Sequence, residues 1–439
     1  MKKFLSLILL LWMFPAWSQL PMKTEEALRD YPTYRTTVKI PVDSVYKMTL
    51  ENPGLLPEDF DKFKYMQKLC LFGNDYDYDF YQLPGYFFSF ENLTHLTIAN
   101  TDLTTLNKNI AKFENLQSLS LANNNLVALP AELADIEDLR SLVIDNNIKK
   151  IPPSRSLTHL EIIFETNVGQ DSGTIPQGIP ELRKLKSLTL NSELTLINIP
   201  QMISIIKGLP ALEELTFIDP NLDEEDLKAL SGIKKITRLH LPAILVDPEV
   251  MKGFSHLKEF SFGKYLNTEA VSRTKFWTTI LAFPDLEQVS TTFEFQDTNF
   301  YHQLKKLNLT LNLDRGLQEQ FAAIKNLPSL NMLTLPRSST VPRNMGELST
   351  VKVVDLTDLY GIDFSIVFGY LMLVPSLEKI IVSNDQFTVF PPETVKFKHL
   401  KEMEVINIEH GMFQAITEKE KNRAKKLLPD CKFTFVEMF

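Results

Sequence analysis

Apolar and polar positions alternate in a repeated pattern along the first third of the chain. The segment 93–98 (Leu-Thr-His-Leu-Thr-Ile) recurs in similar form at 116–121 and at 139–144, and each copy begins 23 residues after the previous one. Leucine or isoleucine stands at positions 1, 4 and 6 of each copy. This spacing predicts a short strand over positions 3 to 5, with the apolar side chains pointing into a shared interior. Since one such unit cannot bury its apolar side alone, the pattern predicts a stack of parallel strands.

An asparagine follows two of these strands at position 9. Asn124 and Asn147 hold this position in the second and third copies. A buried Asn amide can bond the backbone of neighbouring coils at the point where the chain turns and its own polar groups lack partners. We therefore expect Asn124 and Asn147 to connect successive units.

The same pattern continues in weaker form before and after these copies. Position 1 is assigned to Val45 and Met66 on the N-terminal side, and the weakest assignments are those at 157, 286 and 428. The pattern predicts about seventeen repeats with a mean spacing of about 24 residues. The later starts are Leu157, Leu185, Leu212, Ile236, Leu257, Leu286, Leu304, Leu330, Val351, Leu377, Leu400 and Leu428.

The segments between strands are of two kinds. Some place proline after an inward apolar residue, which suits a turn into extended or 3₁₀ structure. An acidic first turn at 223–226 followed by apolar residues at helical spacing predicts a helix instead, and 316–327, 363–373 and 411–428 are similar. The proline-bearing pairs are Leu129-Pro130, Ile151-Pro152, Ile175-Pro176, Ile199-Pro200, Val341-Pro342 and Phe390-Pro391.

The N-terminal residues have the features of a signal peptide. Lys2 and Lys3 precede an apolar stretch at 4–12, and Ala16-Trp17-Ser18 is a small-x-small cleavage site. The apolar stretch is too short to span a bilayer, and no second long one follows. We expect residues 1–18 to be removed from an exported protein, periplasmic or secreted, that has no membrane span.

The remaining residues predict one repeat domain. Residues 19–44 do not fit the pattern and are expected to form an N-terminal cap, because a solenoid needs its first apolar layer covered. The repeat domain is predicted over 45–439, with a C-terminal capping helix at 411–428. No linker or low-complexity segment interrupts it.

Charge and cysteine content limit the partners and the disulfide bonds that we expect for the chain. Without residues 1–18 the chain has 44 basic and 55 acidic residues, a balance of −11. This excess of negative charge gives the chain as a whole no electrostatic attraction to nucleic acid or anionic lipid. Cys70 and Cys431 lie near opposite ends of the predicted stack, beyond disulfide reach, and we expect both to remain thiols.

The segment 116–139 reads L-x-x-L-x-L-x-x-N-x-L-x-x-L-P-x-x-L and resembles the 23-residue typical leucine-rich repeat of the bacterial type. The segment 173–185 is similar to the plant-type variant. The resemblance implies an α/β fold, a leucine-rich repeat solenoid. It would be a curved horseshoe with a parallel sheet on its concave face and mixed 3₁₀, extended and helical segments on its convex face. The resemblance also implies a surface for binding other macromolecules.

Catalytic and metal-binding motifs are weak. The sequence has no H-E-x-x-H, C-x-x-C, G-x-S-x-G or G-x-x-x-x-G-K-[ST] motif, so we expect no enzyme and no cofactor. The irregular stretch 157–182, with Asp171-Ser172-Gly173, leaves a hydrolase as a remote alternative. The loop 74–79 resembles the start of a calcium loop, but Phe80 and Tyr86 stand where that loop needs glycine and glutamate. A solvated loop with exposed tyrosines is the favoured interpretation, and the loop at 75–81 is also a candidate contact for a partner.

A binding surface is expected on the open face of the sheet. Side chains at strand positions 2, 3, 5, 7 and 8 point there and are mostly small and polar, which favours a protein partner of a monomeric chain. The alternative is a glycan or other cell-envelope polymer, for which Phe164 and Phe293 are the candidate aromatic platforms. The residues predicted to contact the partner are Glu161, Phe164, Thr216, His240, Phe293 and Asp355.

Overall fold

The computed structural model divides the chain into two compact units, described here one at a time. The N-terminal unit is Leu20–Pro242 and the C-terminal unit is Ala243–Phe439. The predicted signal peptide (1–18) and N-terminal cap (19–44), and the loop at 74–81, lie outside the residues that the structure describes. The described residues are 47–51, 63–73, 82–164, 175–192, 197–218, 222–312, 316–383, 387, 389–408 and 416–438.

Parallel strands form the sheet of the N-terminal unit. Each begins two residues after the position 1 that the leucine pattern predicts, including the strand expected after Leu157. Leu96 lies opposite Leu119, and Leu119 opposite Leu142, so the leucines at position 4 form a continuous buried row. The strands are β1 (Lys47–Glu51), β2 (Lys68–Phe72), β3 (His95–Ala99), β4 (Ser118–Ser120), β5 (Ser141–Asp145), β6 (His159–Ile163), β7 (Ser187–Asn191), β8 (Glu214–Ile218) and β9 (Arg238–Leu241).

The C-terminal unit continues the pattern with one change of register. Between β12 and β13 the pairing shifts, so that Asn308 lies opposite Met332 and Thr334 lies opposite Thr310. The predicted starts Leu304 and Leu330 give Asn308 and Thr334 the same strand position. This alignment was wrong by two residues, because periodicity alone does not reveal an irregular pairing such as the one between Leu307 and Asn308. The strands are β10 (Glu259–Phe262), β11 (Gln288–Thr292), β12 (Leu307–Thr310), β13 (Leu330–Thr334), β14 (Val353–Asp355), β15 (Lys379–Ser383), β16 (Glu402–Ile408) and β17 (Lys432–Met438).

The asparagine at position 9 acts as predicted in the second copy of the pattern. The Asn124 side chain is buried, and its Nδ2 donates to the carbonyl oxygens of Ile98 (2.7 Å) and Leu121 (2.9 Å). Its Oδ1 accepts from the hydroxyl of Thr101 at 2.8 Å. Asn147 is only half-buried. The prediction is confirmed for Asn124, whose amide joins two successive coils.

The segments between strands in the N-terminal unit follow the two predicted kinds, with one exception. Asp223 caps α3 in a capping box with Asp226, as the acidic turn suggested. Ile199-Pro200 begins an α-helix rather than a 3₁₀ turn, because proline fits the first helical turn and Asn198 caps it by accepting from Gln201 N. The elements are η4 (Gly85–Ser89), η5 (Lys108–Lys112), η6 (Ala131–Asp135), η7 (Ile179–Glu181), α2 (Ile199–Gly208) and α3 (Glu224–Ser231).

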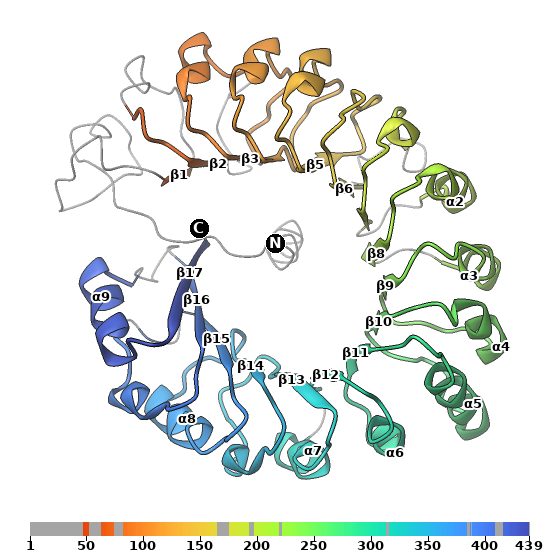
Figure 1. Ribbon diagram of the computed structural model, residues 1–439, viewed down its shortest axis with the longest axis vertical. Coiled ribbons are helices and arrows are strands. Elements are labelled where there is room, and N and C mark those ends of the chain that lie inside the picture. The colour runs from red at the N-terminus through yellow and green to blue at the C-terminus, as the bar shows by residue number, and fades with distance from the viewer. Residues whose placement is uncertain are drawn as a thin grey trace. The chain divides into compact units, whose positions relative to one another are not determined.

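Helices are more frequent between the strands of the C-terminal unit. The predicted helices at 316–327 and 363–373 are present as α7 and α8, and α9 occupies part of 411–428, with β17 following it. In each unit the helical segments lie on the side of the leucine core opposite the strands (Figure 1). The elements are α4 (Pro248–Met251), η8 (Lys252–Phe254), α5 (Ala270–Leu281), η9 (Phe295–Asp297), α6 (Thr298–Tyr301), α7 (Leu317–Ile324), η10 (Met345–Glu347), α8 (Phe364–Leu371), η11 (Pro392–Lys396) and α9 (Glu418–Leu427).

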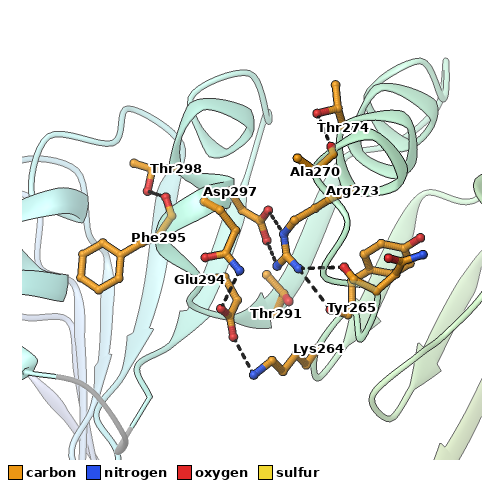
Figure 2. Close-up of polar contacts among 12 residues, drawn as sticks. Lys264, Tyr265, Ala270, Arg273, Thr274, Thr291, Glu294, Phe295, Asp297 and Thr298 are labelled. Atoms are coloured by element: carbon orange, nitrogen blue, oxygen red, sulfur yellow. Dashed lines mark hydrogen bonds and ion pairs between the residues drawn. The ribbon is translucent and has the colours of Figure 1, made fainter.

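A buried ion pair holds α5 in the C-terminal unit. Arg273 donates from Nε and Nη2 to the two carboxylate oxygens of Asp297, both at 2.5 Å, and from Nη1 to the carbonyl oxygen of Tyr265 at 3.2 Å (Figure 2). Both charged side chains are buried. Below them Lys264 pairs with the buried carboxylate of Glu294 at 3.1 Å. The helix is therefore tied to the following repeat by paired charges as well as by apolar contacts.

Candidate functional site

Three of the four predicted contact residues of the N-terminal unit, all except Phe164, fall in one row across its sheet. Glu161 of β6 lies opposite Thr189 of β7, Thr189 opposite Thr216 of β8, and Thr216 opposite His240 of β9. Side chains at this strand position point away from the leucine core, toward the face that we call the concave face. The structure thus brings Glu161, Thr216 and His240 together on neighbouring strands.

Burial divides this row in two. Glu161, Thr189 and Thr216 are buried, with 7%, 5% and 3% of their surface exposed to solvent, and Val143 of β5 is also buried. His240 is half-exposed. We expected all position-5 side chains to be accessible, and this was wrong for Glu161 and Thr216. Strand geometry determines which face a side chain points to, but other parts of the chain decide whether that face is covered.

Glu161 lies in a cluster of buried polar atoms on three adjacent strands. By distance and angle, its Oε1, both amide atoms of Asn191 and the hydroxyl of Thr216 make no hydrogen bond with the described residues, although the Asn191 amide lies close enough to favour the charged carboxylate. Burial raises the pKa of Glu161 to about 7, and the Asn191 side chain partly offsets this rise. Leaving a buried polar group unpaired costs about 1–3 kcal/mol. This cluster therefore lowers the stability of the sheet that carries it.

A charged cluster with partial exposure lies beside this row on β8 and β9. Arg238 Nε contacts Glu214 Oε2 at 2.9 Å, and His240 Nε2 lies 3.8 Å from Glu214 Oε1. About a third of the Arg238 and His240 side chains is exposed. These side chains, unlike Glu161 and Thr216, are accessible to a partner, and their charges give the surface directional polar contacts.

Asp355 on β14 is one of the two predicted contact residues of the C-terminal unit, and it is buried with 1% exposed. Its Oδ1 accepts from the backbone N–H and the hydroxyl of Thr357 at 3.0 and 2.8 Å, and its Oδ2 makes no hydrogen bond with the part of the chain that the structure describes. Burial raises the pKa of Asp355 to about 6, and the two bonds from Thr357 partly offset this rise. The expected exposure of Asp355 was wrong.

Sequence reasoning missed an accessible ladder of alternating charges on β15, β16 and β17. Lys379 Nζ contacts Glu404 at 2.6 Å and lies 3.6 Å from Glu402, and Lys432 lies 3.6 Å from the same Glu402 oxygen. The signal was present, because Glu378-Lys379 and Lys401-Glu402 place opposite charges at strand positions 2 and 3 of successive repeats. Opposite charges on adjacent strands attract each other when the strands align.

The two predicted aromatic platforms are not accessible. Phe164 and Phe293 are each only 1% exposed, and the ring of Phe293 packs edge-on against Phe295 with centroids 5.0 Å apart. Neither ring can stack on a sugar, so the residues that favoured a glycan partner belong to the core.

The expectations about a metal site, a hydrolase site and a membrane span can be compared only with the residues that the structure describes. The part of the chain that the structure describes contains no group of three or more His, Cys, Asp or Glu side chains placed to hold a metal ion. The loop at 74–79, which carried the calcium alternative, and Asp171-Ser172-Gly173, which carried the hydrolase alternative, lie outside it. None of the described helices is long and apolar enough to cross a membrane.

Several solved structures resemble the chain. A leucine-rich repeat protein of Leptospira interrogans is 20% identical, with a TM-score of 0.40, over 95% of this chain and 100% of its own. The complex of TLR13 with ssRNA13 is 15% identical, with a TM-score of 0.38, over 88% of this chain and 72% of the TLR13 chain. The internalin inlF of Listeria monocytogenes is 12% identical, with a TM-score of 0.27, over 82% of this chain and 87% of its own.

The comparison with curated proteins found no match. The family model described as a leucine-rich repeat region matches residues 54–335, well over half of the 439 residues. This match covers β2 to β13, where the leucine rows and the buried Asn124 are found. The predicted α/β leucine-rich repeat solenoid is confirmed, and the chain belongs to the leucine-rich repeat family.

Proposed function

We propose that this chain is an exported, non-enzymatic protein that binds a protein partner through the concave faces of its repeats. A leucine-rich repeat fold suits a scaffold for protein–protein interaction, and members of this family are typically binding proteins rather than enzymes. The observation that carries the proposal is the accessible charge on the concave faces. It consists of Glu214, Arg238 and His240 in one unit and of the Lys379 ladder in the other.

A protein partner fits these clusters better than a glycan does. Half-exposed, paired charges confer specificity in protein interfaces, where a complementary pattern of charges meets them. A glycan site would need accessible aromatic rings, and Phe164 and Phe293 are both buried. The partner-contacting residues are accordingly Arg238 and His240, with Lys379, rather than the buried Glu161, Thr216 and Asp355.

Affinity capture from the native envelope and secreted fractions tests the concave face. The parent chain, Arg238→Glu and Arg183→Glu would serve as three baits; Arg183 is exposed, lies outside the strands and provides the same change of charge. We expect a protein that the parent and Arg183→Glu retain and Arg238→Glu loses. Equal recovery by all three baits would place the partner elsewhere, and recovery of polysaccharide alone would reject a protein partner.

Export has a separate test. If residues 1–18 are a signal peptide, the protein isolated from its source should begin at Gln19, which mass spectrometry of the intact chain would show. A mass that includes Met1–Ser18 in the mature protein would contradict export by this route.

A further inference from the structure

Three neighbouring strands of the N-terminal unit each carry a buried polar side chain that lacks a hydrogen bond to the described residues. Glu161 of β6, Asn191 of β7 and Thr216 of β8 are 7%, 1% and 3% exposed. The atoms concerned are Oε1 of Glu161, both amide atoms of Asn191 and the hydroxyl of Thr216. The large majority of buried polar side chains in proteins bond to protein, water or an ion, so three neighbouring exceptions point to a ligand.

The three side chains share the concave face of the sheet around β7. Thr189 of β7 lies opposite Glu161 on one side and Thr216 on the other. Asn191 follows two residues later on the same face of β7. Glu161 and Thr216 are thus diagonal neighbours of Asn191, with Cα atoms about 8 Å away at the spacings of a parallel sheet. We call Glu161, Asn191 and Thr216 the β7 oxygen cluster.

The strands around the cluster carry more negative than positive charge. Within β5 to β9 there are three carboxylates and one guanidinium group, those of Asp145, Glu161, Glu214 and Arg238. Glu214 is paired with Arg238 at 2.9 Å. Asp145 accepts two backbone N–H bonds, each at 2.9 Å. Glu161 is therefore the one carboxylate of these strands that has neither a cation nor a backbone donor among the described residues.

The flanking residues do not supply a cation for Glu161. Lys186 and Glu213 directly precede β7 and β8, and their charges cancel. Arg140, which precedes β5, is paired with Asp138 at 3.0 Å. The segments that follow β6, β7 and β8 in the sequence lie outside the described residues, and they contain four acidic residues and no lysine or arginine. These segments are 165–174, 193–196 and 219–221.

A monovalent cation fits these ligands better than a divalent ion or a water molecule. Ca²⁺ takes about six to eight oxygen ligands, commonly from several carboxylates, and the described residues contain no group of three or more His, Cys, Asp or Glu placed to hold a metal. One carboxylate balances one positive charge and leaves a neutral buried site, to which amide and hydroxyl oxygens add neutral ligands. Water would bond to the same atoms but would leave the charge of Glu161 without a counterion.

We propose that the β7 oxygen cluster binds a small monovalent cation, K⁺, Na⁺ or NH₄⁺, on the concave side of β6, β7 and β8. The ion provides the positive charge that Glu161 lacks and takes the oxygens of Asn191 and Thr216 as neutral ligands. Because the folded chain gathers these oxygens and the unfolded chain does not, the ion stabilises the sheet beside Arg238 and His240. The cation site goes beyond the proposed partner binding and does not depend on it.

Thermal unfolding of the full chain in different chloride salts tests the site. The pH is 8, above the pKa of about 7 of Glu161, so that its carboxylate is charged. Sodium, potassium and ammonium chloride are compared with tetramethylammonium chloride, whose cation is too large for the cluster, each at about 0.15 M so that screening is equal. We expect at least one small cation to raise Tm by about 3–5 °C over tetramethylammonium, the shift for a dissociation constant roughly tenfold below the salt concentration.

Two variants separate the site from general effects of salt. Glu161→Gln keeps the size of the side chain but removes the charged ligand, and it should have the same Tm in all four salts. Asp355→Asn removes a buried carboxylate of the other unit, leaves the β7 oxygen cluster intact and should keep the difference between salts. A parent with the same Tm in all four salts, or a difference that persists in Glu161→Gln, would overturn the proposal. Stabilisation by calcium chloride alone would overturn the assignment to a monovalent ion.

Discussion

Asp297 and Glu161 are both buried carboxylates, but only Asp297 has a cation beside it. Both oxygens of Asp297 accept bonds from Arg273 at 2.5 Å, whereas Oε1 of Glu161 makes no hydrogen bond with the described residues and the side chain that favours its charge is the neutral amide of Asn191. A paired carboxylate can stay charged inside a protein, while an unpaired one avoids its charge by holding a proton. The first arrangement connects two repeats, and the second makes its sheet sensitive to pH.

Removing the cation from the Asp297 pair should have the largest effect. Arg273→Leu leaves Asp297 buried without a cation beside it, and we expect a loss of about 3–5 kcal/mol in the free energy of unfolding. Urea denaturation followed by circular dichroism would measure it. The double variant Arg273→Leu with Asp297→Leu should recover most of the loss, because no unpaired charge remains. A double variant as unstable as the single one would show that α5 depends on the charges themselves.

Removing the charge of Glu161 should raise the free energy of unfolding, whereas Arg273→Leu lowers it. The pKa of Glu161 is 4.5 in an unfolded chain and about 7 when folded, so its contribution to stability is full below pH 4.5 and is lost as the pH rises to 7. The loss amounts to about 3 kcal/mol. Glu161→Gln cannot ionise and should be more stable than the parent at pH 8 by up to that amount, with little difference at pH 4. Parallel pH profiles of unfolding for the two proteins would contradict the raised pKa.

Asp355 should show a smaller effect over a lower pH range. Its pKa rises from 3.8 to about 6, so the corresponding stability is lost between these pH values. Asp355→Asn keeps an oxygen that can accept from Thr357 and should flatten the pH dependence by about 2–3 kcal/mol. Thermal unfolding at pH 4 and at pH 7 would measure this, with Asp363→Asn, an exposed helix cap of the same unit, as the control. A larger change in Asp363→Asn than in Asp355→Asn would indicate that the loss of any carboxylate, rather than the raised pKa of Asp355, flattens the pH dependence.

The smallest effect on stability is expected for the accessible pair of Arg238 and Glu214. Two-thirds of each side chain is covered, but both reach water, and such pairs contribute about 0–1 kcal/mol. Arg238→Ala should therefore leave the unfolding midpoint in urea nearly unchanged while it weakens partner binding. A loss of several kcal/mol would mean that Arg238 serves the fold rather than recognition.

Most of the repeat framework could be predicted because it depends on local spacing. In the N-terminal unit every strand begins two residues after the predicted position 1, and Asn124 makes the predicted bonds to the neighbouring coil. The register failed at Asn308 and Thr334, where the pairing of β12 with β13 is displaced by two residues from the predicted alignment while the apolar pattern stays intact. The helix at Ile199-Pro200 was missed because proline is compatible with both a 3₁₀ turn and a first helical turn.

The candidate site was predicted less well because exposure is not a local property. The leucine pattern showed correctly that Glu161, Thr216 and His240 share one strand position, and the register places them in one row. It could not show that Glu161 and Thr216 are buried and that His240 is not. The alternating charges around Lys379 could have been found by comparing strand positions 2 and 3 between repeats.

The amino-acid sequence alone determined the repeat, most strand positions and the family, because leucines at fixed spacing can be buried only by stacking parallel strands. Only the tertiary structure decided which polar side chains of the sheet reach water and which buried charges find a partner. Arg273 and Asp297 meet across 24 residues, and Glu161 and Asn191 lie on different strands. Pairings and burial of this kind depend on contacts between distant parts of the chain, and no spacing rule within one repeat contains them.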